Sequence, residues 1–175
     1  MRPITNRSII LALSVIATAC SGDISSSALS PTSASLVKAN GAQPVPFRGS
    51  IATADQAVLA PPFLLANGTG EGTATHLGRF TATYEATADL ATPTATGTYR
   101  FTAANGDLLV ATFVGSAVNI QPGRDQFTEV LTVVSGTGRF AAARGTFTLV
   151  RVGSIDFATQ TSTSTGSMEG ELTLK

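Results

Sequence analysis

Two charged residues, Glu129 and Arg151, stand in otherwise apolar rows of alternating residues. The residues that share these two rows are Phe127, Leu131, Val133, Phe147, Leu149 and Ile155. An unpaired charge among apolar side chains is very costly, so we expect Glu129 and Arg151 to meet as a hydrogen-bonded pair beside a ligand. Two other interpretations stay open: an ion pair without a function, or a strand that bulges and turns either residue to solvent.

The only histidine, His76, is a third candidate. A lone histidine can act as a general acid or base near neutral pH, or it can be a hydrogen-bonded framework residue. Its parity matches that of Phe80, provided that Gly78 introduces no bulge. We therefore expect His76, Glu129 and Arg151 as candidate residues of a ligand-holding interior, and the sequence identifies no catalytic residue. One imidazole and one thiol are too few for a zinc or copper site, so no metal or cofactor is expected.

The elements that must position these side chains have a period of two, which is typical of strands with one face in a core. Between Ala104 and Asp107, the dipeptide Asn105-Gly106 predicts a type I′ hairpin and therefore antiparallel neighbours. The expected strands are Val45–Thr53, Phe63–Ala66 with an extension through Gly70–Leu77, Arg79–Thr87, Thr96–Ala104, Asp107–Ala117, Gln126–Ser135, Thr146–Phe157 and Ser167–Leu174.

Eight short strands without a convincing helix predict an all-β fold. Closure removes the exposed edges on which an open sheet aggregates, so we expect a closed antiparallel eight-stranded β-barrel. A β-sandwich is the alternative. An eight-stranded barrel is just wide enough either to be filled by side chains or to hold one small ligand.

The first residues predict export. Arg2 and Arg7 precede an apolar run that ends in small residues at position 19, the pattern of a signal peptide over residues 1–19. Cys20 then resembles the lipidated cysteine of bacterial lipoproteins, which implies a membrane anchor at Cys20 and a location in the cell envelope. A secreted or periplasmic soluble protein is the alternative. Residues 20–43 are rich in Ser and Ala and predict a flexible tether, and residues 44–175 form the barrel domain.

Charge argues against nucleic acid as a partner. The eleven basic residues, less Arg2 and Arg7, leave nine against eleven acidic residues in the mature chain. No stretch gathers Lys or Arg on one face, so the phosphate-neutralising contribution that drives nucleic-acid binding is missing.

The segment from Gly136 through Phe140 to Gly145, GTGRFAAARG, resembles a hairpin of the allene oxide cyclase and dirigent superfamily of β-barrels. The upstream segment 74–80 and the turn 104–107 resemble uncharacterised bacterial relatives, and the resemblance covers roughly residues 72–148. It implies a small barrel whose interior can hold an apolar molecule: a fatty-acid epoxide in the cyclases, phenolic radicals in the dirigent proteins. The active-site residues of these plant proteins have no matching motif here, so their activities are not carried over.

The sequence therefore favours an envelope-anchored barrel that binds a small apolar ligand and is not an enzyme. One alternative is an isomerase or cyclase acting on an oxidised lipid or phenolic compound. Another is a module whose outer surface binds other proteins. The sequence does not indicate an oligomeric state.

Overall fold

The computed structural model describes residues 42–174; the predicted signal peptide, the predicted lipidation site Cys20 and the predicted tether up to residue 41 lie outside this range. Within it, no helix is long and apolar enough to span a membrane. The elements are β1 (Pro44–Ala60), β2 (Phe63–Ala74), β3 (Gly78–Asp89), β4 (Thr94–Ala103), β5 (Leu108–Gln121), β6 (Arg124–Gly136), the 3-10 helix η1 (Gly138–Phe140), β7 (Arg144–Asp156) and β8 (Thr161–Thr173).

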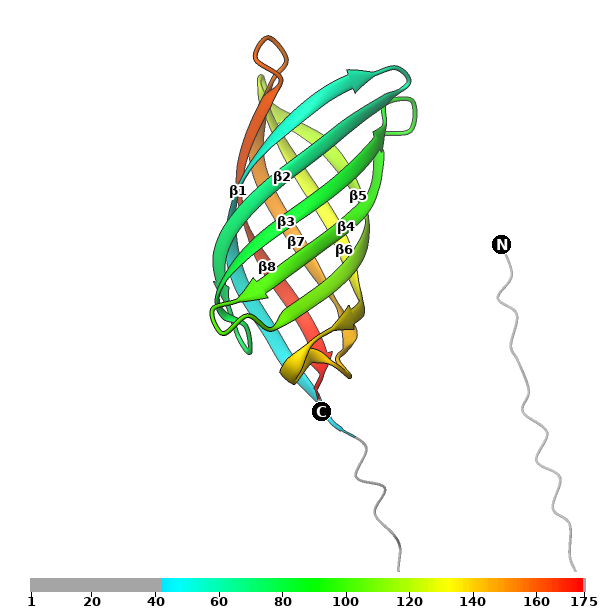
Figure 1. Cartoon of the computed structure of the whole chain (residues 1–175). Coiled ribbons are helices and arrows are strands. Elements are labelled where there is room, and N and C mark those ends of the chain that lie inside the picture. Colours follow the sequence, from blue (N-terminus) through cyan, green and yellow to red (C-terminus); the bar gives the residue numbers. More distant parts are fainter. Residues whose placement is uncertain (1–41, 175) are drawn as a thin grey trace, which may run out of the picture. The chain divides into compact units, whose positions relative to one another are not determined.

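The strands form one closed antiparallel barrel, shown in Figure 1. Each strand pairs with the next along the chain, and β8 pairs back with β1 from Pro44↔Thr173 to Gln56↔Thr161. This last pairing excludes a two-sheet sandwich, because it leaves neither sheet edge open. The predicted all-β class and closed eight-stranded barrel are confirmed.

Several strands are longer than the sequence predicts, and the two largest differences are in β1 and β8. β1 continues to Ala60 instead of ending at Thr53, and β8 begins at Thr161 instead of Ser167. Three added residues of each strand pair with each other across the β1–β8 seam, from Ala54↔Thr163 to Gln56↔Thr161. The added residues are mostly Ala, Ser, Thr and Gly, whose similar polarity hides the alternation that marks a strand.

The two ends of the barrel differ. At one end, here called the closed end, β1 begins, β8 ends, and η1 lies in the β6–β7 connection (Figure 1). Leu77 and Phe140 from the connections at this end are 1% and 0% exposed. At the other end, here called the mouth, lie the β1–β2, β3–β4, β5–β6 and β7–β8 turns. The connections thus cover the interior at the closed end but not at the mouth.

The closed half of the interior is filled by large side chains. Phe47 and Phe147 lie with their ring centroids 4.7 Å apart, and the Phe80 ring meets Phe101 edge to face at 5.5 Å. Leu109, Leu131, Leu149, Met168 and Leu172 are each at most 2% exposed. This cluster leaves no room for a ligand in the closed half.

The β4–β5 turn is antiparallel as predicted but differs in type. Gly106 has φ +87°, whereas Asn105 is not among the positive-φ residues of the described chain. The Gly106 N–H donates to the Ala103 carbonyl and the Ala103 N–H donates to the Asp107 carbonyl. These bonds form a three-residue loop with a left-handed glycine instead of a type I′ turn, and the Asn105 side chain holds Asp107 through two hydrogen bonds.

Candidate functional site

Glu129 of β6 and Arg151 of β7 meet inside the barrel, halfway along its axis. Arg151 Nη2 donates to Glu129 Oε1 at 2.7 Å, and Nε donates to Oε2 at 3.1 Å. Glu129 is 4% exposed and Arg151 is 5% exposed. The predicted hydrogen-bonded pair is confirmed, in the two-pronged geometry that fits a guanidinium to a carboxylate.

Side chains from β8, β1 and β4, on either side of the β6–β7 pair, complete this polar layer. Arg151 Nη1 donates to Ser164 Oγ at 2.9 Å and to Thr53 Oγ1 at 3.3 Å, and these two hydroxyls lie 2.7 Å apart. Tyr99 Oη donates to Glu129 Oε2 at 3.1 Å. Every nitrogen of Arg151 is thus engaged, and no buried polar side-chain atom in the described residues lacks a partner.

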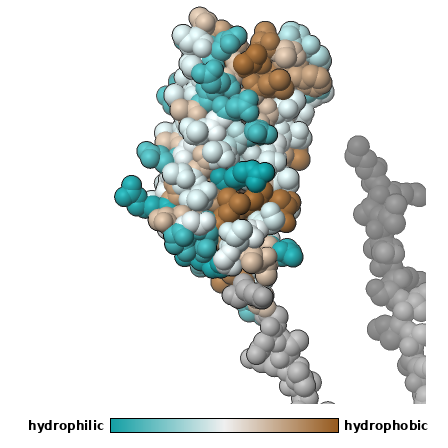
Figure 2. Space-filling view, viewed as in Figure 1, coloured by the Kyte–Doolittle hydropathy of each residue, from teal (hydrophilic) through white to brown (hydrophobic). Residues whose placement is uncertain are grey.

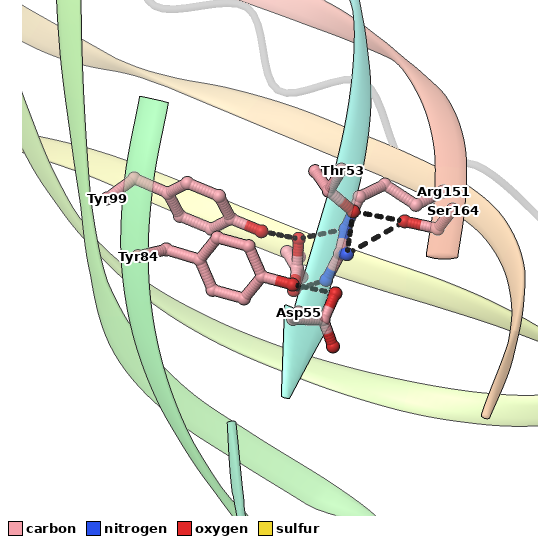
Figure 3. Close-up of polar contacts among 7 residues, drawn as sticks. Thr53, Asp55, Tyr84, Tyr99, Arg151 and Ser164 are labelled. Atoms are coloured by element: carbon pink, nitrogen blue, oxygen red, sulfur yellow. Dashed lines mark hydrogen bonds and ion pairs between the residues drawn. The ribbon is translucent and has the colours of Figure 1, made fainter. Parts of the chain in front are cut away.

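Tyr84 and Asp55 form a second pair beside this layer. Tyr84 Oη donates to Asp55 Oδ1 at 2.5 Å, and the rings of Tyr84 and Tyr99 stack with centroids 4.8 Å apart. Figure 3 shows both hydroxyls pointing toward the charged groups of the layer. Burial raises the pKa of both tyrosines well above the usual value, and Asp55 adds to the rise at Tyr84 as Glu129 does at Tyr99. Both hydroxyls therefore stay protonated donors at neutral pH.

A cavity of about 230 Å³ lies between the polar layer and the mouth. Its floor is made by Asp55, Tyr84, Glu129, Arg151 and Ser162. Its walls are lined mainly by small side chains, namely Ala57, Ala66, Ala86, Ala88, Ala95, Gly115 and Ala117. We call this cavity the cup. Because small residues occupy the positions that large residues occupy in the closed half, the barrel is solid at one end and hollow at the other.

The rim of the cup is apolar and exposed. Leu90, Phe157 and Ile155 line its opening, and Leu59 and Phe63 in the β1–β2 hairpin are 50% and 43% exposed. Figure 2 shows one hydrophobic patch at this end of the barrel and a second one nearer the closed end. Two larger hollows, of about 720 and 760 Å³, are more open than the cup and are lined by outward-facing threonines and charged residues together with inward-facing residues such as Tyr84 and Phe80.

His76 does not belong to this site. It lies exposed in the β2–β3 turn at the closed end, where its Nε2 is 3.2 Å from the Pro46 carbonyl oxygen. His76 and Gly78 both have φ +67°, so the chain turns here and the parity with Phe80 is lost. The expectation that His76 faces the interior with Glu129 and Arg151 is corrected on this ground.

Other residues of the site were not singled out from the sequence. Tyr84 shares an apolar row with Phe80, and Tyr99 shares one with Phe101, so a search for polar groups in apolar rows finds both tyrosines. Asp55 lies beyond the predicted end of the first strand, and Thr53 is its last predicted residue. Only the β1–β8 pairing places these two residues in the site, and the periodicity of a single strand does not reveal that pairing.

No group of three or more His, Cys, Asp or Glu side chains among residues 42–174 is arranged to hold a metal ion. A search against models of known protein families found no match, and neither the curated proteins nor the solved structures searched contained a significant match. The resemblance to allene oxide cyclase and dirigent proteins stays a prediction.

Proposed function

We propose that this protein is a binding protein for one small, mainly apolar molecule, which it holds in the cup. The carrying observation is the contrast between the two halves of one interior: large side chains fill the closed half, whereas alanines and a glycine line a cavity of about 230 Å³ toward the mouth. An apolar cavity of about 150 Å³ binds benzene. By proportion, the cup accommodates a group of roughly nine non-hydrogen atoms.

The arrangement suits binding because the cup joins apolar walls to a fixed polar floor. Most small-molecule sites combine a largely apolar lining with a few polar groups that set the orientation of the ligand. Here the Glu129–Arg151 pair and its hydroxyl partners hold the floor in place without the ligand. The exposed apolar rim offers a path from an apolar surrounding into the cup.

The proposal includes the predicted export and anchor. The chain enters β1 at the closed end, so a lipid attached at Cys20 would connect to the end of the barrel opposite the mouth. The protein would then sequester or present its ligand at the surface of the cell envelope.

An isomerase or cyclase receives less support. Both oxygens of Glu129 accept hydrogen bonds from Arg151, and the raised pKa of Tyr84 and Tyr99 makes either a poor base at neutral pH. A surface interaction module has one favourable observation: Val114 and Val130 are register partners on the outside of β5 and β6 and are 63% and 51% exposed. This outer face does not explain the hollow interior.

The test of this proposal is a variant in which a large side chain occupies the cup. Ala86 faces inward on β3 and lines the cavity, so Ala86→Phe places a ring where the ligand is expected. We expect the unchanged protein to bind 1-octanol and Ala86→Phe to bind it about tenfold more weakly or not at all. Tyrosine fluorescence reports binding, since the chain has two tyrosines, no tryptophan, and Tyr84 on the cup floor.

Thr87→Phe is the matched control, because it adds the same ring to the neighbouring, outward-facing position. It should leave the affinity unchanged, and circular dichroism should show both variants folded. Native mass spectrometry of the protein purified from its own cells supplies the natural ligand as an added mass. Equal octanol binding by the Ala86 and Thr87 variants would refute the cup as the site.

A further inference from the structure

The ionisable groups of the cup are unbalanced. Four carboxylates line it, from Asp55, Asp89, Asp125 and Glu129, against the single guanidinium of Arg151. Arg151 is already paired with Glu129. The ion pairs found among residues 42–174 include none of the three aspartates. The cup thus combines an apolar wall with a net negative charge.

The hydrogen-bonding groups of the cup are also unbalanced, because free acceptors outnumber free donors. The Tyr84 hydroxyl donates a hydrogen bond to Asp55, the Tyr99 hydroxyl donates one to Glu129, and Arg151 donates from all three nitrogens within the polar layer. Four of the five N–H groups of Arg151 are used in these bonds. The free donors of the floor are therefore few: one N–H on Nη2 of Arg151 and the Ser162 hydroxyl, which can both donate and accept.

The acceptors of the cup are only half engaged. Asp55 accepts from Tyr84, Asp89 accepts from the Ala91 N–H, and Asp125 accepts from Asn119. Each of these bonds uses Oδ1. The second carboxylate oxygen of each aspartate accepts no hydrogen bond from the described residues. A ligand therefore finds acceptors of negative charge and few donors.

We infer that the ligand is an apolar primary amine, protonated at neutral pH, whose ammonium group lies on the cup floor at Asp55 and whose apolar body lies against the alanine wall. An ammonium group has three donors and no acceptor, which matches both imbalances. A carboxylate would meet four carboxylates and few free donors, and an alcohol would satisfy an acceptor without balancing the charge. Asp89 and Asp125, nearer the mouth, raise the local concentration of a cation at the opening.

This inference rests on the proposed function, because it names the chemical class that the cup takes. Its test compares three probes of equal chain length on the full mature protein: octylamine, 1-octanol and octanoate. An alkylammonium stays protonated at neutral pH, as lysine does. We expect octylamine to bind about tenfold or more tightly than 1-octanol, and octanoate to bind most weakly. Calorimetry and tyrosine fluorescence give the three dissociation constants.

Asp55→Asn identifies the group responsible. The amide oxygen can still accept from Tyr84, so the fold is kept while the charge is lost. The ratio of octylamine to octanol affinity should fall toward one, with octanol binding retained. Glu71→Gln is the matched control, because Glu71 is an exposed carboxylate on the outside of β2, and it should leave the ratio unchanged.

The outcomes separate the two proposals. If octanol or octanoate binds as tightly as octylamine, the cup still binds apolar molecules and the amine inference is overturned. An amine preference that survives in Asp55→Asn overturns the assigned floor contact. If none of the three probes binds, the proposed function falls and the inference falls with it.

Discussion

The Glu129–Arg151 pair decides whether the middle of this barrel is stable. Both side chains are at least nine-tenths buried, and removing two charges from water costs more than their attraction returns unless hydrogen bonds complete the geometry. Thr53, Ser164 and Tyr99 supply those bonds. The layer is therefore a unit: its members stabilise the barrel only together.

Breaking this pair from either side should destabilise the barrel, and the two losses should not add. Glu129→Gln leaves the guanidinium uncompensated and Arg151→Met leaves the carboxylate uncompensated, so each should lower the free energy of unfolding by about 3–5 kcal/mol. The double variant should lose clearly less than the sum of the two. Urea unfolding followed by circular dichroism measures all four proteins. Additivity to within about 0.5 kcal/mol would show that the two groups do not act as a pair.

For single residues, the sequence predicted the charged residues that interrupt an apolar row. It missed the polar residues that stand in rows of mixed polarity. Glu129 and Arg151 stand among large apolar neighbours, so their inward direction could be inferred. Asp55 stands among Ala, Gln and Thr, where inward and outward rows have similar polarity. The prediction for His76 was wrong because alternation only counts residues, whereas the chain turns at His76 and Gly78, which both have a positive φ.

The strands position the site through a repeated pairing of large and small residues. An inward glycine lies directly opposite each of several large inward side chains, in the pairs Gly68↔Tyr84, Gly72↔Phe80, Gly97↔Phe113, Gly115↔Glu129, Gly166↔Arg151 and Gly170↔Phe147. A Cβ on any of these glycines would overlap the facing residue or its backbone. Because these glycines have no Cβ, they leave room for the side chains of the site residues.

Filling one of these spaces should disturb the site without touching its polar atoms. In Gly68→Ala the new methyl group overlaps the Tyr84 ring, and overpacking of this kind costs about 1–3 kcal/mol. Thr69→Ala, on the outward-facing neighbour, should change stability by no more than about 0.5 kcal/mol. Denaturant unfolding gives both values, and near-ultraviolet circular dichroism reports the displaced tyrosine. An equal, small effect of both substitutions would contradict the close packing of Gly68 against Tyr84.

These pairs also explain what the sequence could and could not specify about the strands. Phe80, Tyr84 and Tyr99 alternate with polar residues along their strands, and eight segments with a period of two predicted the barrel. The inward glycines gave no signal, because a glycine between polar residues marks neither face. Only the register, which comes from the pairing of two strands, shows that each glycine meets a large side chain.

For the whole molecule, the important feature is a barrel that is half solid and half hollow. The sequence contained the alanines of the cup and the phenylalanines of the closed half, but their heights in the barrel depend on strand tilt and register. A barrel of this size can be filled or hollow, and here each state occupies one half. The packed half, with its apolar cluster, carries the stability that permits an unfilled mouth.

The stability of the whole barrel should fall in alkaline solution because of its two tyrosines. Burial raises the folded-state pKa of Tyr84 and Tyr99 above about 10, the value in an unfolded chain. The folded state therefore holds these protons more tightly, and its stability is complete below about pH 10. Above that pH the unfolded chain ionises first, so stability is lost by up to about 1.4 kcal/mol per pH unit for each tyrosine until the folded-state pKa is reached.

The composition of the chain makes this prediction easy to read. Tyr84 and Tyr99 are the only tyrosines and there is no tryptophan, so tyrosinate absorbance reports these two buried groups and nothing else. We expect the absorbance to rise together with the loss of barrel circular dichroism, in one cooperative transition. Tyr99→Phe should reduce the alkaline slope of the unfolding free energy by about half. If the absorbance instead rises near pH 10 while the barrel stays folded, the tyrosines are accessible to solvent and the floor of the cup is not the closed polar layer described.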